Sequence, residues 1–136
     1  MPVDPTVLKH RIKEIRSSIS ELTNLTSKPF EELNTSEIYS IRYLIIVIVE
    51  ALVSICIHIS TEAYNETPES YREAIRIIGS KLRIKCIRDL EALVALRNLL
   101  IHRYWTIDDK RIHESIKRNF ECLDSFLTRI EEEFLR

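Results

Sequence analysis

The residues best able to do chemistry stand together between Arg97 and Tyr104. Arg97 supplies a permanent, planar cation that suits phosphate oxygens. His102 supplies a group that gains and loses a proton near neutral pH. Asn98 and Tyr104 add an amide and a phenol within the same segment. In residue types, this set is sufficient to cut a phosphodiester bond without a metal ion, with Arg97 and His102 as the catalytic pair and Asn98 in support.

The spacing of these residues bears on how they meet. On one helix, Arg97 and His102 lie about 140° apart, whereas Tyr104 lies about 20° from Arg97. Asn98 and His102 are four residues apart and are therefore neighbours on one face. One helix alone does not aim Arg97 and His102 at the same phosphate. A second copy of the helix, packed across a two-fold axis, would bring them together, so the spacing favours a homodimer.

The overall charge is nearly balanced, which leaves any contact with nucleic acid to a local patch. The formal net charge is −1. The segment before the motif is rich in Lys and Arg, and a basic strip of this kind can follow an RNA backbone. The same strip is equally compatible with a solvated helix face or with a surface that receives an acidic partner protein. Its members are Arg72, Arg76, Lys81, Arg83, Lys85 and Arg88.

A polar stripe interrupts the most apolar segment of the chain. Glu50, Ser54, His58 and Thr61 fall within about 80° of one another on a helix. We predict that this stripe faces solvent. The alternative is that it lines a dimer cleft opposite the motif, in which case Glu50 would pair with Arg97.

Length and composition bound the architecture that positions these residues. The chain has 136 residues, which fits a single domain over 1–136. Gly occurs once and Pro four times, and so few chain-breaking residues favour long helices. Cys56, Cys86 and Cys122 are scattered and odd in number, so we interpret them as reduced core residues, with a disulfide as the less favoured alternative. With no signal peptide visible, the sequence predicts a cytoplasmic protein.

Periodic apolar residues predict five helices with short connections, that is, an all-α antiparallel bundle of four to five helices. Asp4 and Asp108 are the predicted N-caps of the first and last helices. Thr67 is the predicted N-cap of the third, and Gly79 the residue that ends it. The predicted helices run from about Pro5 to Thr26, Ser36 to Tyr64, Pro68 to Gly79, Lys81 to Arg103, and from Asp108 to about Phe134.

The second of these helices is apolar enough to raise the possibility of a membrane span. Glu50 would lie in the middle of such a span, and Arg42 and His58 also interrupt it. A spanning helix needs about 20 residues with few charges. We therefore predict a helix buried in a bundle or dimer, and no membrane.

The pattern Arg-Asn-x-x-x-His-x-Tyr at the end of a long helix, in an all-helical chain of this length, resembles the HEPN superfamily, and within it the HepT family of ribonuclease toxins. The resemblance covers nearly the whole chain. It implies a homodimeric endoribonuclease that needs no metal and no other cofactor, with the site at Arg97, Asn98 and His102. It also implies a nucleotidyltransferase antitoxin of the MntA type as partner. In some such pairs the antitoxin adenylylates the motif tyrosine, which corresponds to Tyr104.

The chemistry of RNA agrees with this resemblance. RNA carries its own nucleophile, the 2′-OH, which DNA lacks, so the expected products are 2′,3′-cyclic phosphates and DNA is not cleaved. His102 would transfer a proton and Arg97 would stabilise charge on phosphorus. The alternative is a non-catalytic helical subunit that binds nucleotide or substrate for a minimal nucleotidyltransferase. Cleavage of RNA by the purified protein in the presence of EDTA separates the two.

Overall fold

The chain folds into helices joined by short turns. The computed structural model describes residues 3–136, with the side chains of residues 117–119 outside the description. No strand occurs in that range, so the predicted all-α class is confirmed. The elements are α1 (Pro5–Thr26), η1 (Phe30–Glu32), α2 (Thr35–Tyr64), α3 (Tyr71–Lys81), α4 (Ile87–His102), η2 (Tyr104–Thr106) and α5 (Asp109–Phe134), where η marks a short 3-10 helix.

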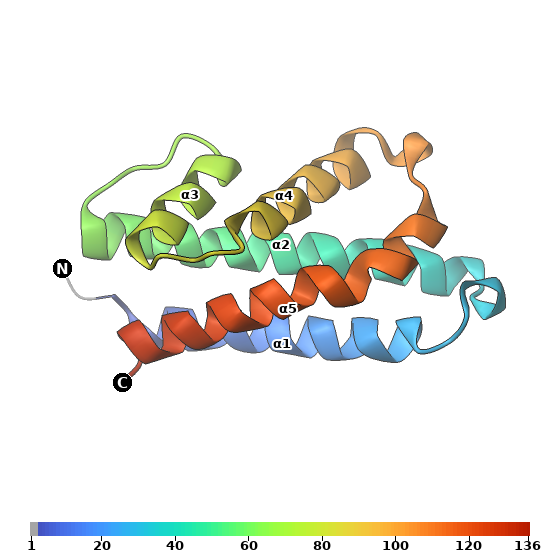
Figure 1. Cartoon of the computed structure of the whole chain (residues 1–136), viewed down its shortest axis with the longest axis horizontal. Coiled ribbons are helices and arrows are strands. Elements are labelled where there is room, and N and C mark those ends of the chain that lie inside the picture. The colour runs from blue at the N-terminus through green and yellow to red at the C-terminus, as the bar shows by residue number, and fades with distance from the viewer. Residues whose placement is uncertain (1–2) are drawn as a thin grey trace.

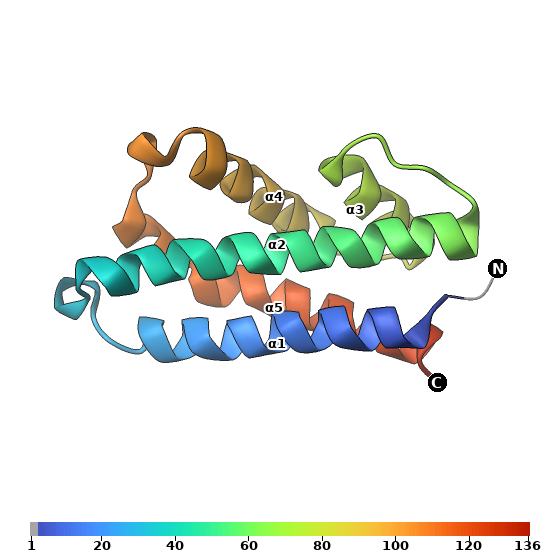
Figure 2. The same ribbon diagram turned by 180° about the vertical axis from the view of Figure 1, so that it is seen from behind.

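Three long helices run side by side and two shorter ones cover α2. Figures 1 and 2 show α1, α2 and α5 along the long axis of the molecule, with α3 and α4 following one another along α2. Both ends of the chain lie at the same end of the bundle. Of the five, α2 contacts α1, α3 and α4, and α5 closes the bundle against α1 and α4. The motif helix α4 is therefore held between α2 and α5.

Side-chain caps set the helix starts that local sequence predicts well. Asp4 accepts the backbone N–H of Thr6 at 2.9 Å at the start of α1. Asp108 accepts the N–H of Arg111 at 3.2 Å at the start of α5. Both predicted N-caps are therefore confirmed. At α2 the cap is Asn34, which forms a reciprocal capping box with Glu37, so that the helix begins at Thr35, one residue before the predicted start.

The start of α3 differs from the prediction. Thr67 and Pro68 do not open the helix, which begins at Tyr71. Its N-cap is Ser70, whose hydroxyl accepts the N–H of Glu73 at 3.0 Å. Thr67–Pro68 and Ser70 are both plausible starts by local rules, and the structure uses the Ser70 cap.

The end of α3 also differs, because Gly79 does not terminate it. The helix continues to Lys81, and the left-handed backbone after it belongs to Arg83, with φ of 55°. The next helix accordingly begins at Ile87 rather than at Lys81. Gly79 lies inside α3, where a Cβ would stand 2.8 Å from Cγ1 of Ile87. Its role is close helix packing, not a turn.

The apolar helix α2 forms the centre of the core. It is long and apolar enough to cross a membrane, but 61% of its most apolar window is buried inside the bundle. A helix that is apolar nearly all round is also what the core of a bundle requires. The burial of α2 by protein therefore favours the predicted core helix. Its fully buried side chains include Ile45, Ile48, Leu52, Ile55 and Ile59.

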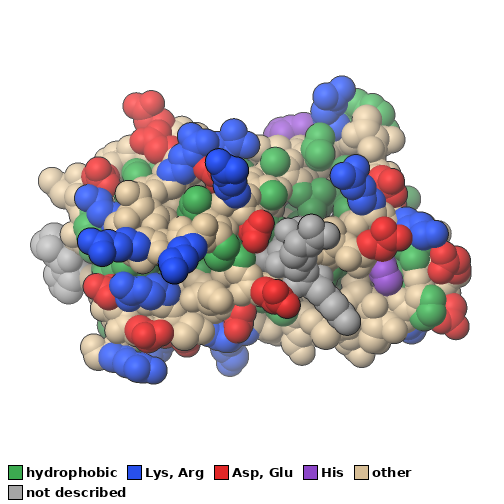
Figure 3. All heavy atoms as spheres, in the orientation of Figure 1, with side chains coloured by type: hydrophobic (Ala, Val, Ile, Leu, Met, Phe, Trp, Pro, Cys, Tyr) green, Lys and Arg blue, Asp and Glu red, His purple; other side chains and the backbone are tan. Residues whose placement is uncertain are grey.

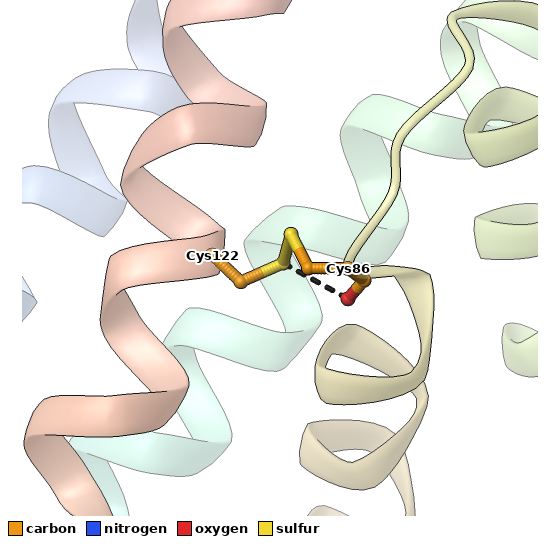
Figure 4. The surroundings of a disulfide bond; sticks show 2 residues. All are labelled: Cys86 and Cys122. Atoms are coloured by element: carbon orange, nitrogen blue, oxygen red, sulfur yellow. Dashed lines mark hydrogen bonds between the residues drawn. A yellow bond between two sulfur atoms is a disulfide. The ribbon is translucent and has the colours of Figure 1, made fainter.

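Two of the three cysteines are bonded to each other. Figure 4 shows the disulfide between Cys86, just before α4, and Cys122 in α5. The prediction that all three cysteines are reduced is therefore wrong for this pair, and it holds for Cys56, which is free and buried. The packing of α4 on α5 brings the two Cα atoms to 5.9 Å across 36 residues of sequence. Burial raises the pKa of the Cys56 thiol, so that residue stays protonated in the core.

Candidate functional site

Arg97 is held in place by two hydrogen bonds to side chains. Its Nε donates to Oε1 of Glu50 on α2 at 2.7 Å, and its Nη1 donates to Oδ1 of Asn98 at 2.9 Å. Only 17% of the Arg97 side chain is exposed. Nη2 donates no hydrogen bond to the described residues. The guanidinium is therefore held at two of its three nitrogens.

A tyrosine from α3 completes the support of this cation. The hydroxyl of Tyr71 donates to Oε2 of Glu50 at 2.7 Å. The Tyr71 ring also faces Arg97, with the guanidinium carbon 4.7 Å from the ring centre. The bond to Glu50, together with burial, raises the pKa of the Tyr71 phenol above its usual value. The phenol therefore stays protonated as a donor, and Glu50 is shared between Tyr71 and Arg97.

The polar stripe of α2 lines an open cavity at the surface of the bundle. The cavity measures about 510 Å³ and lies between the start of α1, the second half of α2 and the start of α3. Thr61 is exposed and 41% of the Glu50 side chain is exposed, so the solvent-facing prediction is confirmed at these positions, and the ion pair between Glu50 and Arg97 that went with the alternative is also present. The lining residues are Val7, Arg11, Glu50, Val53, Ser54, Ile57, His58, Thr61, Glu62 and Tyr71.

His102 stands apart from this cluster. It is the last residue of α4 and is exposed. No hydrogen bond or ion pair joins it to another described residue, including Arg97 and Asn98. Asn98 thus contacts the cation and not the histidine. Within one chain the structure joins Arg97 to Asn98 but leaves His102 free to meet another molecule.

Tyr104 does not continue the α4 helix. The helix ends at His102, because Arg103 has φ of −140° and ψ of 43°, and Tyr104 opens the short η2 turn. Placing Tyr104 beside Arg97 by helical phase is therefore wrong. The Tyr104 side chain is 60% exposed and packs edge-to-face on Trp105, which is itself 68% exposed. Its hydroxyl is accessible from solvent.

An ion pair that the sequence did not predict fixes this turn. Arg42 on α2 donates from Nε and Nη2 to the two carboxylate oxygens of Asp109, at 2.8 and 2.7 Å. Its Nη1 donates to the backbone carbonyl of Tyr104 at 3.3 Å. The bonds to Asp109 raise the pKa of Arg42 despite burial. Arg42 therefore ties the turn that carries Tyr104 to α2 through a two-pronged contact.

The basic residues before the motif are all exposed, and Figure 3 shows Lys and Arg side chains gathered over α3 and the beginning of α4. Two of them have partners: Arg76 pairs with Glu91, and the Lys81 ammonium lies 5.2 Å from the centre of the Tyr64 ring. Arg83 occupies the left-handed position after α3. The set forms a basic face on the same side of α2 as the motif helix. No group of His, Cys, Asp or Glu able to hold a metal ion occurs among the described residues.

Tyr71 and Arg42 are the site residues that residue-by-residue reading of the sequence missed. Both make their contacts across helices, over 26 residues for Tyr71 to Arg97 and 67 for Arg42 to Asp109, so no local spacing reveals them. For Arg42 the sequence did contain one signal of a special role, because it is a charged residue within an otherwise apolar helix. A half-buried cation in such a place favours an acidic partner.

Comparison with known proteins gives one family and a set of related folds. Residues 9–130 match the family described as Ribonuclease HepT-like. A chain of the tri-AMPylated HEPN toxin of Shewanella oneidensis in complex with its MNT antitoxin superposes with a TM-score of 0.86, at 18% identity, over 96% of this chain and 100% of that one. A mutant of the toxin–antitoxin complex MntA–HpeT gives a TM-score of 0.81 at 20% identity, over 94% and 99%. A toxin–antitoxin complex with AMP-PNP gives 0.82 at 18%, over 96% and 100%. No curated protein matches in sequence.

Proposed function

Because this chain belongs to the Ribonuclease HepT-like family, we propose that it is a metal-independent endoribonuclease and the toxin of a toxin–antitoxin pair. The observation that carries the proposal is the held Arg97, which is bonded by Glu50 and Asn98 and faces Tyr71, with one nitrogen left for a phosphate. A cation fixed before the substrate arrives stabilises developing charge without reorganisation. We infer that residues 1–136 act as one such domain.

The proposed reaction uses the nucleophile that RNA carries. The 2′-oxygen attacks the adjacent phosphorus and loses its proton to one His102. The bond from phosphorus to the 5′-oxygen breaks, and the leaving oxygen takes a proton from a second His102. Arg97 stabilises the negative charge on the phosphorane oxygens. The products are a 2′,3′-cyclic phosphate and a 5′-hydroxyl, and no electrons are gained or lost.

This reaction needs two copies of the chain, because Arg97 and His102 do not meet within one. We therefore predict a homodimer that brings His102 of each copy to Arg97. Light scattering at micromolar concentration is expected to give twice the chain mass of 16.1 kDa. Dimers of this kind bury interfaces of at least standard size. A mass that stays at one chain across that range would refute the dimeric site.

The basic face over α3 and the start of α4 is our proposed path for the RNA backbone, and the cytoplasm our proposed location. The partner that we propose is a nucleotidyltransferase of the MntA type. The likeness to HEPN and HepT chains from complexes with MNT and MntA antitoxins supports it. We also propose that this partner transfers AMP from ATP to the Tyr104 hydroxyl, which is exposed. The phenol oxygen would attack the α-phosphorus and pyrophosphate would leave.

Adenylylation of Tyr104 is expected to be lost in Tyr104→Phe, because that variant keeps the ring but lacks the acceptor oxygen. Intact-mass spectrometry after incubation with the cognate antitoxin and ATP is expected to show one or more AMP groups on the parent and none on the variant. The matched control is Tyr43→Phe, since Tyr43 is similarly exposed on α2. AMP on the Tyr104 variant, or none on the parent, would leave masking by the bound partner as the mode of control.

The decisive test of the proposed function is RNA cleavage by the purified protein in the presence of EDTA. Single-stranded RNA is expected to yield 2′,3′-cyclic ends, and a DNA strand of the same sequence is expected to stay intact. The proposal fails if RNA survives at protein concentrations where the dimer is formed. That result would favour the non-catalytic alternative, in which Arg97 only binds a nucleotide phosphate for the nucleotidyltransferase.

A further inference from the structure

The cavity beside Arg97 shares two of its walls with the residues that hold that cation. Glu50 and Tyr71 both contact Arg97 and both line the cavity. An RNA phosphate bound at Arg97 would therefore lead the strand to the cavity mouth. His58 and Glu62 lie about 12 and 18 Å from Glu50 along α2, so the base that reaches them would be two to three nucleotides from that phosphate. The floor is apolar, with Val53 and Ile57 among the lining residues, and Tyr71 adds an aromatic ring. A flat, partly apolar group such as a nucleobase suits these walls.

The charges around the cavity favour a neutral ligand with N–H donors. Arg97 neutralises Glu50, and Arg11 pairs with Glu14 at 3.1 Å. Among the described residues, Glu62 makes no ion pair and no hydrogen bond from its side chain. One carboxylate thus remains to accept hydrogen bonds from whatever enters, and a base that offers two adjacent N–H groups would satisfy both of its oxygens.

His58 provides a donor one helical turn from this acceptor. Its Nε2 accepts the backbone N–H of Asp4 at 3.0 Å. A ring nitrogen that accepts carries no proton, which assigns the proton of the neutral ring to Nδ1. His58 and Glu62 are four residues apart on α2 and so lie on the same face. The residues lining the cavity therefore include a donor and a two-oxygen acceptor one helical turn apart.

We propose that this cavity is a base-specific subsite that binds guanine of the RNA substrate. The inference rests on the proposed ribonuclease function. Guanine presents the O6 and N7 acceptors beside the N1–H and N2–H donors, so O6 or N7 accepts from His58 Nδ1 while N1–H and N2–H donate to Glu62. Adenine has an amino donor where guanine has O6 and lacks the paired donors. Cytosine offers a single amino group. Guanine is the base whose edge matches the order of groups on α2.

The test is binding of short RNA analogues that cannot be cleaved. Each is a 2′-fluoro oligonucleotide with one guanine, one inosine or one adenine in a uridine context. Inosine differs from guanine only by loss of the N2 amino group. The parent protein is expected to bind the guanine strand about tenfold more tightly than the inosine strand, the effect of losing one arm of a bidentate pair. The adenine strand is expected to bind no better than the inosine strand.

Glu62→Gln identifies the protein group responsible. The variant is expected to bind the guanine and inosine strands equally and more weakly than the parent binds guanine. The matched control is Glu66→Gln, which changes an exposed carboxylate beyond the end of α2 that does not line the cavity. It is expected to keep the preference of the parent. Thermal melting of each variant checks the fold, and the comparison of guanine with inosine on the parent does not depend on any variant.

Because these strands cannot be cut, the result is independent of catalysis. Absent cleavage of ordinary RNA would refute the ribonuclease function, while a guanine preference lost in Glu62→Gln would still establish the subsite. Equal binding of guanine and inosine strands by the parent would overturn the inference. So would a guanine preference that survives in Glu62→Gln.

Discussion

Replacing His102 by Ala is expected to slow RNA cleavage by about 10²–10⁴-fold, the range typical of a general acid or base. His102 is the titratable group of the motif and has no structural partner among the described residues. Its loss should therefore remove proton transfer and leave the fold unchanged. The measurement is the initial rate on a labelled oligoribonucleotide with EDTA present, alongside circular dichroism and thermal melting. Induced expression of the variant is expected not to arrest growth.

The matched control is His10→Ala, which removes an exposed histidine from α1. It should cleave like the parent. For Arg97 the informative substitution is Arg97→Lys. Arg97→Ala would leave the Glu50 carboxylate without the cation that now neutralises it. Lys keeps the charge but cannot bond Glu50 and Asn98 as a rigid fork, so a large loss of rate is expected. If the His102 variant cleaves at the parent rate, the assignment of catalysis to the motif is wrong.

Reduction of the Cys86–Cys122 disulfide is expected to lower the free energy of unfolding by about 4 kcal/mol, the entropy of closing a loop of this length in the unfolded chain. The bond spans 36 residues of sequence, which include all of α4 and η2. For a domain of this size the loss corresponds to a fall in Tm on the order of 10 °C. Thermal or urea unfolding with and without dithiothreitol measures it.

The double variant Cys86→Ala with Cys122→Ala is the control for this effect. It should unfold at the lower midpoint and should not respond to dithiothreitol. Titration of thiols in denaturant should count only Cys56 in the oxidised parent and all three cysteines after reduction. Three thiols before any reductant is added, with a midpoint that does not change, would show that the bond does not form in solution.

Local rules of sequence were sufficient for most helix boundaries. The Asp4 and Asp108 caps act within three residues of themselves, so their effect is visible in the sequence. The prediction that Gly79 ends its helix was wrong because a glycine near a helix end has two uses. It can adopt the left-handed backbone of a turn, or it can allow a neighbouring helix to pack closely. Only the position of Ile87 decides between them. The predicted start at Thr67 was wrong because Ser70, three residues later, also fits the local rules for an N-cap and is the one used.

The residue types of the site could be predicted from the sequence, but the contacts between the side chains could not. The motif identified Arg97, Asn98 and His102. The polar stripe identified Glu50 as a partner of Arg97, but only in one of the two alternatives for the surroundings of that stripe. The contribution of Tyr71 depends on where α3 packs against α2, which no spacing encodes. The disulfide was missed for a similar reason. The predicted cytoplasmic location and the odd number of cysteines argued against a bond, but the packing of α4 on α5 brings Cys86 and Cys122 together. Contacts between distant segments are the part that single-sequence reasoning cannot supply.

Gly79 affects how the helix that carries Tyr71 packs beside Arg97, the proposed catalytic cation. Its bare backbone lets the last turns of α3 press against Ile87 at the start of α4. Tyr71 lies eight residues earlier on the same rigid helix, about 12 Å away along its axis. A Cβ at position 79 would overlap the Ile87 side chain, which would have to shift, and any displacement of α3 along with it would move the Tyr71 ring relative to Arg97. The smallest residue of the chain thus contributes, through the packing of α3 on α4, to the surroundings of Arg97 without contacting it.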